Sequence, residues 1–206
     1  MEIRLEHTGR KFNTEWIFRN LSYTFESGSA YAVLGRNGSG KSTLLQVIAG
    51  NLLPSAGRVI YTHHGAPVTD QEVFRYLSLV APYQELIEEF TLREMLDFHF
   101  SFKKLREGFT VGSITGLLGF GNTGRKPIRQ FSSGMKQRVK LACAMFSDTP
   151  LLLLDEPTTN LDRAGTDWYL DLVSKHSAGR TIIICSNLHQ VESGFCKATL
   201  SIEDYK

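Results

Sequence analysis

The sequence predicts an α/β fold with a mostly parallel sheet, and two stretches carry this prediction. Residues 30–34, AYAVL, form a short apolar run that leads into the glycine-rich segment GRNGSGKST. Residues 151–154, LLLL, form a second apolar run, which ends at an acidic pair. Continuous apolar runs of strand length are typical of parallel strands buried on both faces. With 206 residues, 42% of them hydrophobic and 21% charged, the chain suits a single well-buried domain, 1–206.

Two short segments near the N-terminus predict an antiparallel β ribbon. Residues 2–6, EIRLE, and 21–25, LSYTF, each alternate polar and apolar side chains, as half-buried strands do. The stretch between them contains two aromatic residues, Phe12 and Trp16.

Residues 35–43, GRNGSGKST, fit the phosphate-binding pattern GxxxxGKS. Glycines let successive backbone N–H groups face phosphate oxygens, Lys41 supplies a charge for the β and γ phosphates, and Ser42 offers its hydroxyl to Mg²⁺. The strand expected before the loop and the helix expected over 42–49 supply the context that this motif requires. The segment therefore predicts binding of a nucleoside triphosphate through Gly35, Arg36, Asn37, Gly38, Ser39, Gly40, Lys41, Ser42 and Thr43.

An aromatic ring upstream of this loop is a candidate for stacking on the nucleotide base. Phe12 follows the first expected strand, and the ribbon would carry it around the nucleotide. Ordinary packing of Phe12 inside the small sheet is the alternative. Trp16 is the weaker candidate for the same contact.

The segment after the phosphate loop begins with residues that break the helix, Gly50 and Pro54. Residues 55–65 read as a turn followed by a strand, and residues 74–81 as a further apolar segment. His63 and His64 are adjacent, so on a strand they would point to opposite faces. We therefore expect exposed histidines that do not share a metal ion.

A helix is expected to begin at Thr91, because Thr91 and Glu94 form a capping-box signature, and to run toward Phe102. Residues 103–130 are richer in Lys, Arg and Gly without a strong period, which predicts an irregular helical appendage. A further helix is expected over 131–146, where Ser132 and Ser133 stand at the N-terminus. Backbone donors and the helix dipole favour an anion there, although most serine caps only close a helix. Its apolar face consists of Met135, Val139, Ala142, Cys143 and Phe146.

The apolar run 151–154 is followed directly by Asp155 and Glu156. These acids would lie at the carboxyl end of a strand, which is where ligands bind in open α/β sheets. Asp155 is expected to hold Mg²⁺ through water, and Glu156 to activate the attacking water as a general base. Residues 158–162 then form a turn before a helix around 164–175. A last core strand is expected over 181–185, and an alternating segment over 198–202.

Composition argues against several classes of protein. The net charge is +2 and is spread along the chain, so no nucleic-acid partner is expected. The cysteines, Cys143, Cys185 and Cys196, are scattered in mostly apolar surroundings, which is typical of reduced thiols in the cytosol. The charged N-terminus does not fit a signal peptide, and no apolar run approaches the ~18 residues of a membrane span. Any membrane association is therefore expected to go through a partner.

Nearly the whole chain resembles the nucleotide-binding subunit of an ATP-binding cassette (ABC) protein. Four motifs occur in the family's order: GRNGSGKST, FSSGMKQR, LLLLDEP and TTNLD, of which the first and third correspond to Walker A and Walker B. The resemblance implies a P-loop NTPase core with a mostly parallel sheet, an N-terminal antiparallel β subdomain and an inserted helical subdomain at about 84–146.

The same resemblance implies that two such domains pair head to tail. We expect a homodimer, and pairing with a different cassette is the alternative. Each ATP then lies between the phosphate loop of one chain and the signature loop of the other. The family's usual signature, LSGGQ, reads FSSGM in this chain. The residues expected to touch the γ phosphate bound by the second copy are Ser132, Ser133 and Gly134.

Two positions depart from the family's pattern. The family usually has a glutamine before the helical subdomain that senses magnesium and the membrane partner. Tyr83 occupies that place, and we expect Gln84, one residue later, to be the metal ligand because tyrosine does not coordinate magnesium as an amide does. The family's switch histidine is replaced by Asn187, which donates hydrogen bonds but does not titrate. His189 is not expected to be its equivalent.

The resemblance implies an ATPase that powers a transporter whose membrane-spanning segments belong to a separate chain. The subunit would lie on the inner face of the cell membrane through that partner. A compact cassette resembles bacterial exporter subunits, including the type that serves cytochrome maturation, more than importer subunits. Two alternatives stay open: a soluble cassette ATPase acting in translation, repair or cluster assembly, and a nucleotide-switched binding module with weak hydrolysis.

Overall fold

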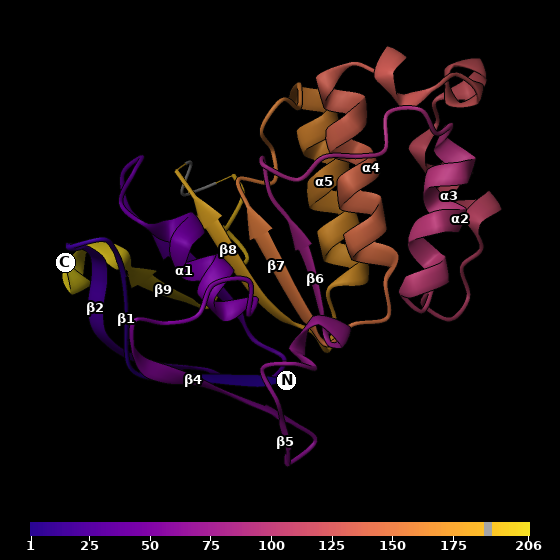
Figure 1. Ribbon diagram of the computed structural model, residues 1–206. Helices are drawn as coiled ribbons and strands as arrows, with labels where there is room; N and C mark the ends of the chain where they lie inside the picture. Colours follow the sequence, from indigo (N-terminus) through magenta and orange to yellow (C-terminus); the bar gives the residue numbers. More distant parts are fainter. Residues whose placement is uncertain (188–190) are drawn as a thin grey trace. The chain divides into compact units, whose positions relative to one another are not determined.

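The structure is a computed structural model that describes residues 1–187 and 191–206 (Figure 1). The chain divides into two compact units. The first consists of Met1–Leu79, Pro150–Glu156 and Ala178–Lys206, and the second of Val80–Thr149 and Pro157–Ser177. No helix of the described chain is long and apolar enough to cross a membrane.

The first unit contains a four-stranded sheet in the order β2-β1-β4-β5, whose pairings are antiparallel. The expected ribbon is confirmed but is longer than 2–6 and 21–25, because pairing continues to a turn at Asn13, next to the pair Phe12 and Glu15. The extension was missed because its side chains are largely exposed and lack a clear alternation. The strands are β1 (Glu2–Phe12), β2 (Glu15–Phe25), β4 (Ala56–His63) and β5 (Ala66–Val68).

Strand β1 is irregular at His7, where φ is 47° and the register shifts between Leu5 and Thr8. Such an extra residue bends a strand and increases its twist. Gly57 of β4 approaches this bulge so closely that a Cβ there would lie 2.2 Å from the Glu6 carbonyl oxygen. Only glycine fits at that position, where φ is also positive.

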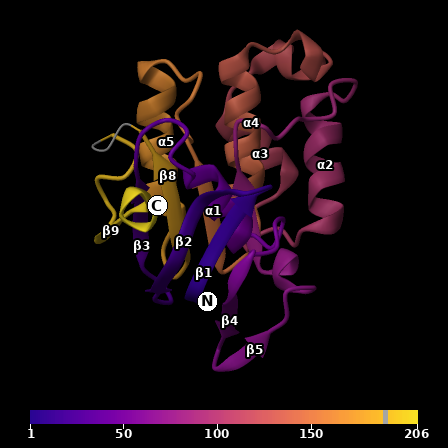
Figure 2. The same cartoon turned by 60° about the vertical axis from the view of Figure 1, so that its left-hand side comes forward.

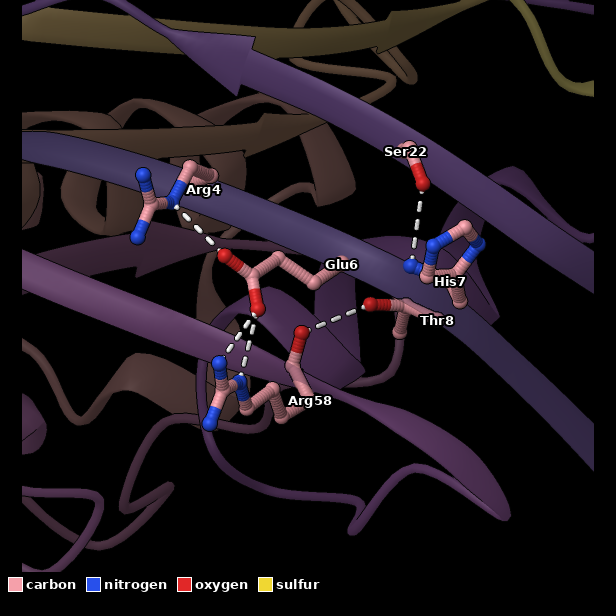
Figure 3. Close-up of polar contacts among 6 residues, drawn as sticks. All are labelled: Arg4, Glu6, His7, Thr8, Ser22 and Arg58. Carbon is pink, nitrogen blue, oxygen red and sulfur yellow. Dashed lines mark hydrogen bonds and ion pairs between the residues drawn. The ribbon is translucent and has the colours of Figure 1, made fainter.

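Polar side chains hold the strands together at the bulge (Figure 3). The Glu6 carboxylate forms ion pairs with Arg4 Nε at 3.1 Å and Arg58 Nη2 at 2.7 Å, and the Arg58 guanidinium lowers the pKa of Glu6. The Thr8 hydroxyl donates to the Arg58 carbonyl oxygen at 2.8 Å, and the Ser22 hydroxyl accepts from the His7 N–H at 3.0 Å. The bulge is thus tied to both neighbouring strands.

The expected orientation of the two histidines is wrong. His63 ends β4, and His64 leaves the strand with φ at 50°, so the two rings lie side by side with centroids 4.1 Å apart. His64 is exposed as expected, but His63 is only partly so. The alternation rule fails here because it holds only while the backbone stays extended.

The second sheet of this unit has the strand order β6-β7-β8-β3-β9. The pairings β7–β8, β8–β3 and β3–β9 are parallel, which confirms the predicted mostly parallel sheet (Figure 1). Leu34 pairs with both Ser186 and Ser201, so the carboxyl ends of three strands meet at one edge. The strands are β3 (Ala30–Leu34), β6 (Leu77–Val80), β7 (Leu151–Asp155), β8 (Thr181–Ser186) and β9 (Ala198–Ser201).

Helix α1 (Lys41–Ile48) packs between the two sheets, contacting β1 of one and β7 and β8 of the other (Figure 2). Leu44, Leu45 and Ile48 are fully buried in one apolar cluster with residues of both sheets. Each such side chain contributes roughly 1.5–3 kcal/mol by leaving water. The described part of this unit also contains the 3₁₀ helices η1 (Val73–Arg75) and η4 (Ile202–Tyr205).

The second unit is helical. The predicted capping box is confirmed, since the Thr91 hydroxyl accepts from the Glu94 N–H and Glu94 Oε2 accepts from the Thr91 N–H at 2.8 Å. The stretch 103–130 is more regular than expected, because a second capping box, Thr110 with Ser113, starts a helix there. The helices are α2 (Leu92–Phe102), α3 (Val111–Leu118), α4 (Ser133–Phe146), α5 (Arg163–His176), η2 (Gly121–Arg125) and η3 (Ile128–Gln130).

Candidate nucleotide-binding site

The glycine-rich loop joins β3 to α1 within the first unit. Gly35 and Gly40 have positive φ, 154° and 104°. A Cβ at Gly35 would lie 2.5 Å from Ser39 Oγ, and one at Gly40 would lie 2.5 Å from Ile17 Cγ2. Both positions therefore require glycine, which lets the backbone fold tightly around an anion.

Lys41 begins α1, and its side chain folds back across the loop. The Nζ atom donates to the Gly35 carbonyl at 2.8 Å, the Arg36 carbonyl at 3.0 Å and Asn187 Oδ1 at 2.6 Å. Lys41 is only 5% exposed, so these acceptors replace the water that a buried ammonium loses. The charge is thus held at the centre of the loop.

A cavity of about 310 Å³ opens over the loop. This volume lies within the range of small-molecule sites in proteins. The cavity wall does not include Gly35, Arg36 or Phe12, which the sequence predicted as nucleotide-binding residues. It does include Ile17, which the sequence analysis did not identify. The lining residues are Ile17, Asn37, Gly38, Ser39, Gly40, Lys41, Ser42, Thr43 and Glu156.

Asp155 is the last residue of β7 and is 1% exposed. Neither carboxylate oxygen meets the geometry of a hydrogen bond with any residue that the structure describes. Burial raises the pKa of Asp155, and the nearby Ser42 hydroxyl and Lys41 act in the opposite direction. A buried carboxylate with only a weakly aligned hydroxyl and an ammonium nearby is costly. A cation at this position would offset that cost.

The donor set fits Mg²⁺, which prefers oxygen ligands and is usually held by one or two carboxylates together with substrate phosphates. Asp155 and the Ser42 hydroxyl supply such oxygens. Among residues 1–187 and 191–206, no group of three or more His, Cys, Asp or Glu side chains forms a cage that would hold a metal ion without a substrate. The oxygen donors of Asp155 and Ser42, completed by substrate phosphates, would suit magnesium.

Glu156 follows Asp155 in a left-handed backbone conformation, with φ at 46°. A non-glycine residue in this region is strained, and such strain is typical of functional positions. The Glu156 N–H donates to the Cys185 carbonyl at 2.9 Å, which fixes the turn. The turn aims the carboxylate at the cavity.

Asn187 follows β8 and connects the two charged groups of the site. Its Oδ1 accepts from Lys41 at 2.6 Å, and its Nδ2 donates to Glu156 Oε1 at 2.5 Å. These partners fix the orientation of the amide, because an ammonium only donates and a carboxylate only accepts. The bridge was not predicted, since it joins three residues that are far apart in sequence. His189 lies outside the described residues.

A buried acid near this site was also missed. Glu192 is 2% exposed, accepts a hydrogen bond from the Ser186 hydroxyl, and contributes to raising the pKa of Asp155. No local pattern marks Glu192, because it follows β8 in an irregular segment.

Phe12 lies at the end of the β1–β2 hairpin and is 44% exposed, with the Arg10 guanidinium 4.7 Å from its ring centroid. Trp16, opposite Lys11, has the Lys11 ammonium over its ring at 5.5 Å. Neither ring lines the cavity. Stacking of Phe12 on a base stays a prediction.

The signature residues lie at the start of α4 in the second unit. Ser132 caps the helix by accepting from the Met135 N–H at 3.2 Å. Gly134 packs so closely on the 158–162 segment that a Cβ there would lie 2.9 Å from the Asn160 carbonyl oxygen. Ser133 is exposed at the first turn. The contact of these residues with the γ phosphate of a second copy stays a prediction.

The close approach at Gly134 predicts a measurable cost of substitution. Gly134→Ala is expected to lower the free energy of unfolding by about 1–3 kcal/mol, because the added methyl forces backbone apart. Gly116→Ala is the matched control: Gly116 is exposed within α3 and its Cβ would meet nothing, so alanine should stabilise by up to ~1 kcal/mol. Urea unfolding of both variants checks this. Equal effects would contradict the packing argument.

Gln84 belongs to the second unit, where its Oε1 accepts from the Ala81 N–H at 3.0 Å. Lys140 of α4 donates to the carbonyl oxygens of Ala81 at 3.2 Å and Gln84 at 3.4 Å, which holds the same turn. Tyr83, beside it, is 48% exposed. The role of Gln84 as a metal ligand stays a prediction.

Comparison with known proteins places this site in a family. The ABC transporter family matches residues 18–159. The chain is 34% identical over 193 residues to the cytochrome c biogenesis ATP-binding export protein CcmA of Agrobacterium fabrum, covering 92% of this chain and 90% of that protein. It is 30% identical over 192 residues to the lantibiotic transport ATP-binding protein SrtF of Streptococcus pyogenes, covering 90% of this chain and 80% of that protein. Its fold matches that of a dimeric bacterial ABC transporter cassette with a TM-score of 0.80 at 23% identity, covering 98% of this chain and 95% of that chain.

Proposed function

The chain belongs to the ABC transporter family as a nucleotide-binding subunit, and we propose that it hydrolyses ATP with Mg²⁺ to power transport by a separate membrane-spanning partner. One observation carries the hydrolytic part of this proposal. The phosphate loop and Glu156 line the same cavity, and Asn187 bridges Lys41 to Glu156 beside it. Charge neutralisation of the phosphates and activation of a water would thus occur in one place.

ATP binding would begin with the phosphates entering the cavity over the loop. Backbone N–H groups of the loop face the phosphate oxygens, and Lys41 exchanges its contact with Asn187 for the β and γ phosphates. Asp155 and Ser42 would hold Mg²⁺, which neutralises developing phosphate charge when bound. Gln84 is proposed as a further metal contact, and Phe12 as the residue that stacks on the base.

Glu156 would then act as general base on the attacking water. The hydrogen bond from Asn187 Nδ2 orients the Glu156 carboxylate, so Asn187 would serve hydrolysis by positioning the base. Its contact with Lys41 would hold the ammonium in place only until the phosphates arrive. Asn187 would also donate to the γ phosphate once Lys41 has moved to the phosphates.

The complete site would require a second cassette. Ser132, Ser133 and Gly134 would close over the ATP bound by the partner chain, with two copies of this chain as the simplest pair. The dimeric structure of a related cassette supports this arrangement. We propose that residues 1–206 form one cassette domain whose helical subdomain spans about 84–146.

The names of relatives favour the transport role over the alternatives. CcmA is called an ATP-binding export protein and SrtF a lantibiotic transport ATP-binding protein, so export is the favoured direction. The subunit would then act on the cytoplasmic face of the cell membrane, held there by its membrane-spanning partner. Glu156 in the cavity argues against a module that only binds nucleotide.

The proposal is tested by measuring ATP turnover of the purified chain and of Asn187→His from pH 5.5 to 8. The wild type is expected to hydrolyse ATP only with Mg²⁺, and Asn187→His to turn over faster. Once Lys41 has moved to the phosphates, residue 187 faces two acceptors, Glu156 and the γ phosphate; imidazolium donates a charge-assisted hydrogen bond to each, whereas neutral imidazole has a single N–H. The gain should therefore be largest below about pH 6.5 and shrink as pH rises. An absence of wild-type turnover would contradict the ATPase proposal, and an unchanged or lower rate in Asn187→His would contradict the role of Asn187.

A further inference from the structure

The register of the parallel sheet brings the C-terminal segment to the phosphate loop. Strand β9 pairs with β3 in parallel, and Ser201 lies opposite Leu34. The next residues of the two strands, Ile202 and Glu203 on one side and Gly35 and Arg36 on the other, therefore leave the sheet together. The first turn of the loop thus has η4 as its neighbour.

Ile202 anchors η4 in the core. It is fully buried in the apolar cluster, and its Cγ2 would lie 2.8 Å from a Cβ at Gly35. At the other end of η4, the Lys206 carbonyl accepts from Arg19 Nε of β2 at 3.4 Å. The segment is thus fixed at both ends relative to the loop.

Glu203 contacts the loop directly. Its Oε1 accepts from the Arg36 backbone N–H at 2.9 Å, and the Arg36 Nε lies 3.7 Å from the same oxygen. From the other side, Lys41 Nζ donates to the Gly35 and Arg36 carbonyls, and the Ser39 N–H donates to the Arg36 carbonyl at 3.1 Å. Glu203 and Lys41 thus hold the same turn from opposite directions.

A carboxylate beside a phosphate-binding loop is electrostatically unfavourable for an anionic ligand. The exposed Arg36 guanidinium offsets part of this charge, but an exposed ion pair contributes little by itself. The hydrogen bond from the Arg36 N–H is the stronger reason for an acceptor side chain at this position, because that N–H would otherwise lose its partner.

We infer that Glu203 is a positioning residue for ATP binding: it fixes the Gly35–Arg36 peptide group, whose carbonyl oxygen, that of Gly35, orients the Lys41 ammonium toward the phosphates. Glu203 is not among the residues that line the cavity, so it would act on ATP only through the loop. The inference rests on the proposed function, because the loop must bind ATP for the position of Lys41 to matter. A hydrogen-bond acceptor at position 203, rather than a negative charge, is what the geometry requires.

Three variants distinguish the hydrogen bond of Glu203 from its negative charge and from the rest of η4: Glu203→Ala, Glu203→Gln and Asp204→Ala. Glu203→Ala is expected to weaken ATP binding about 3- to 10-fold, the effect of one lost hydrogen bond. The KM for ATP should rise by the same factor while kcat stays within about twofold. Glu203→Gln keeps an acceptor oxygen and should bind ATP at least as tightly as the wild type. Asp204→Ala changes the exposed neighbour in η4 and should have no effect.

Calorimetric titration with ATP and Mg²⁺, together with steady-state kinetics, gives these values. Wild-type affinity in Glu203→Ala would overturn the inference, as would equal losses in Glu203→Gln and Glu203→Ala. An equal loss in Asp204→Ala would also overturn it, because the effect would then belong to η4 as a whole. If the wild type itself bound no ATP, the proposed function would fail instead, so the two failures are distinguishable.

Discussion

Glu156→Gln is expected to lower ATP turnover by about 10²–10⁴-fold while leaving ATP affinity nearly unchanged. Glutamine keeps the size of the side chain but removes the carboxylate that would take a proton from the attacking water. Affinity should survive because the phosphate loop and Lys41, which supply the attraction for ATP, are unaltered. Single-turnover hydrolysis and ATP titration of the same preparation measure the two quantities separately.

Glu26→Gln is the matched control, since Glu26 is exposed just after β2 and lies outside the cavity wall. Its turnover should equal that of the wild type. Retention of substantial turnover in Glu156→Gln would contradict the assignment of Glu156 as the base. Loss of ATP affinity there would mean that Glu156 instead supports the loop.

Lys41→Met is expected to weaken ATP binding by about 10²-fold or more, because it removes the buried positive charge that would meet the β and γ phosphates. The effect is large since Lys41 is 5% exposed and water does not replace the lost charge. At a concentration of 100 times its wild-type Kd, ATP should stabilise the wild type by ~2.7 kcal/mol, and at the same concentration this stabilisation should fall to ~0.4 kcal/mol or less in the variant. Thermal unfolding with and without ATP and Mg²⁺ measures it.

Lys175→Met serves as the control, because Lys175 is an exposed lysine of α5 paired with Asp171. It should keep the full ATP-dependent stabilisation. Undiminished stabilisation in Lys41→Met would refute the phosphate-binding role of the loop.

The elements that sequence predicted well are those whose signal is local. The runs 30–34 and 151–154 appear as β3 and β7, and the capping box at Thr91 appears as the start of α2. Each depends on neighbouring residues alone, through apolar continuity or a side chain that reaches three positions along the chain. Helix α3 was less visible because Gly112 and Gly116 interrupt its period.

The site was predictable only where a motif is contiguous. The loop around Lys41 and the pair Asp155 and Glu156 are recognisable because each belongs to a short contiguous motif. The bridge through Asn187 and the contact of Glu203 with Arg36 depend instead on the strand order β7-β8-β3-β9, which brings distant segments to one edge. No local pattern encodes that order.

The central claim, that ATP binding by this chain powers a membrane-spanning partner, is tested most directly by purification of tagged Glu156→Gln with ATP. The variant should trap the closed ATP-bound pair, and detergent-solubilised membranes of its own cell provide the candidates, identified by mass spectrometry. We expect a multi-spanning membrane protein in near-equal amount, absent when Lys41→Met is added to the variant. Recovery of ribosomes, nucleic acid or a soluble assembly partner in its place would contradict the transport role.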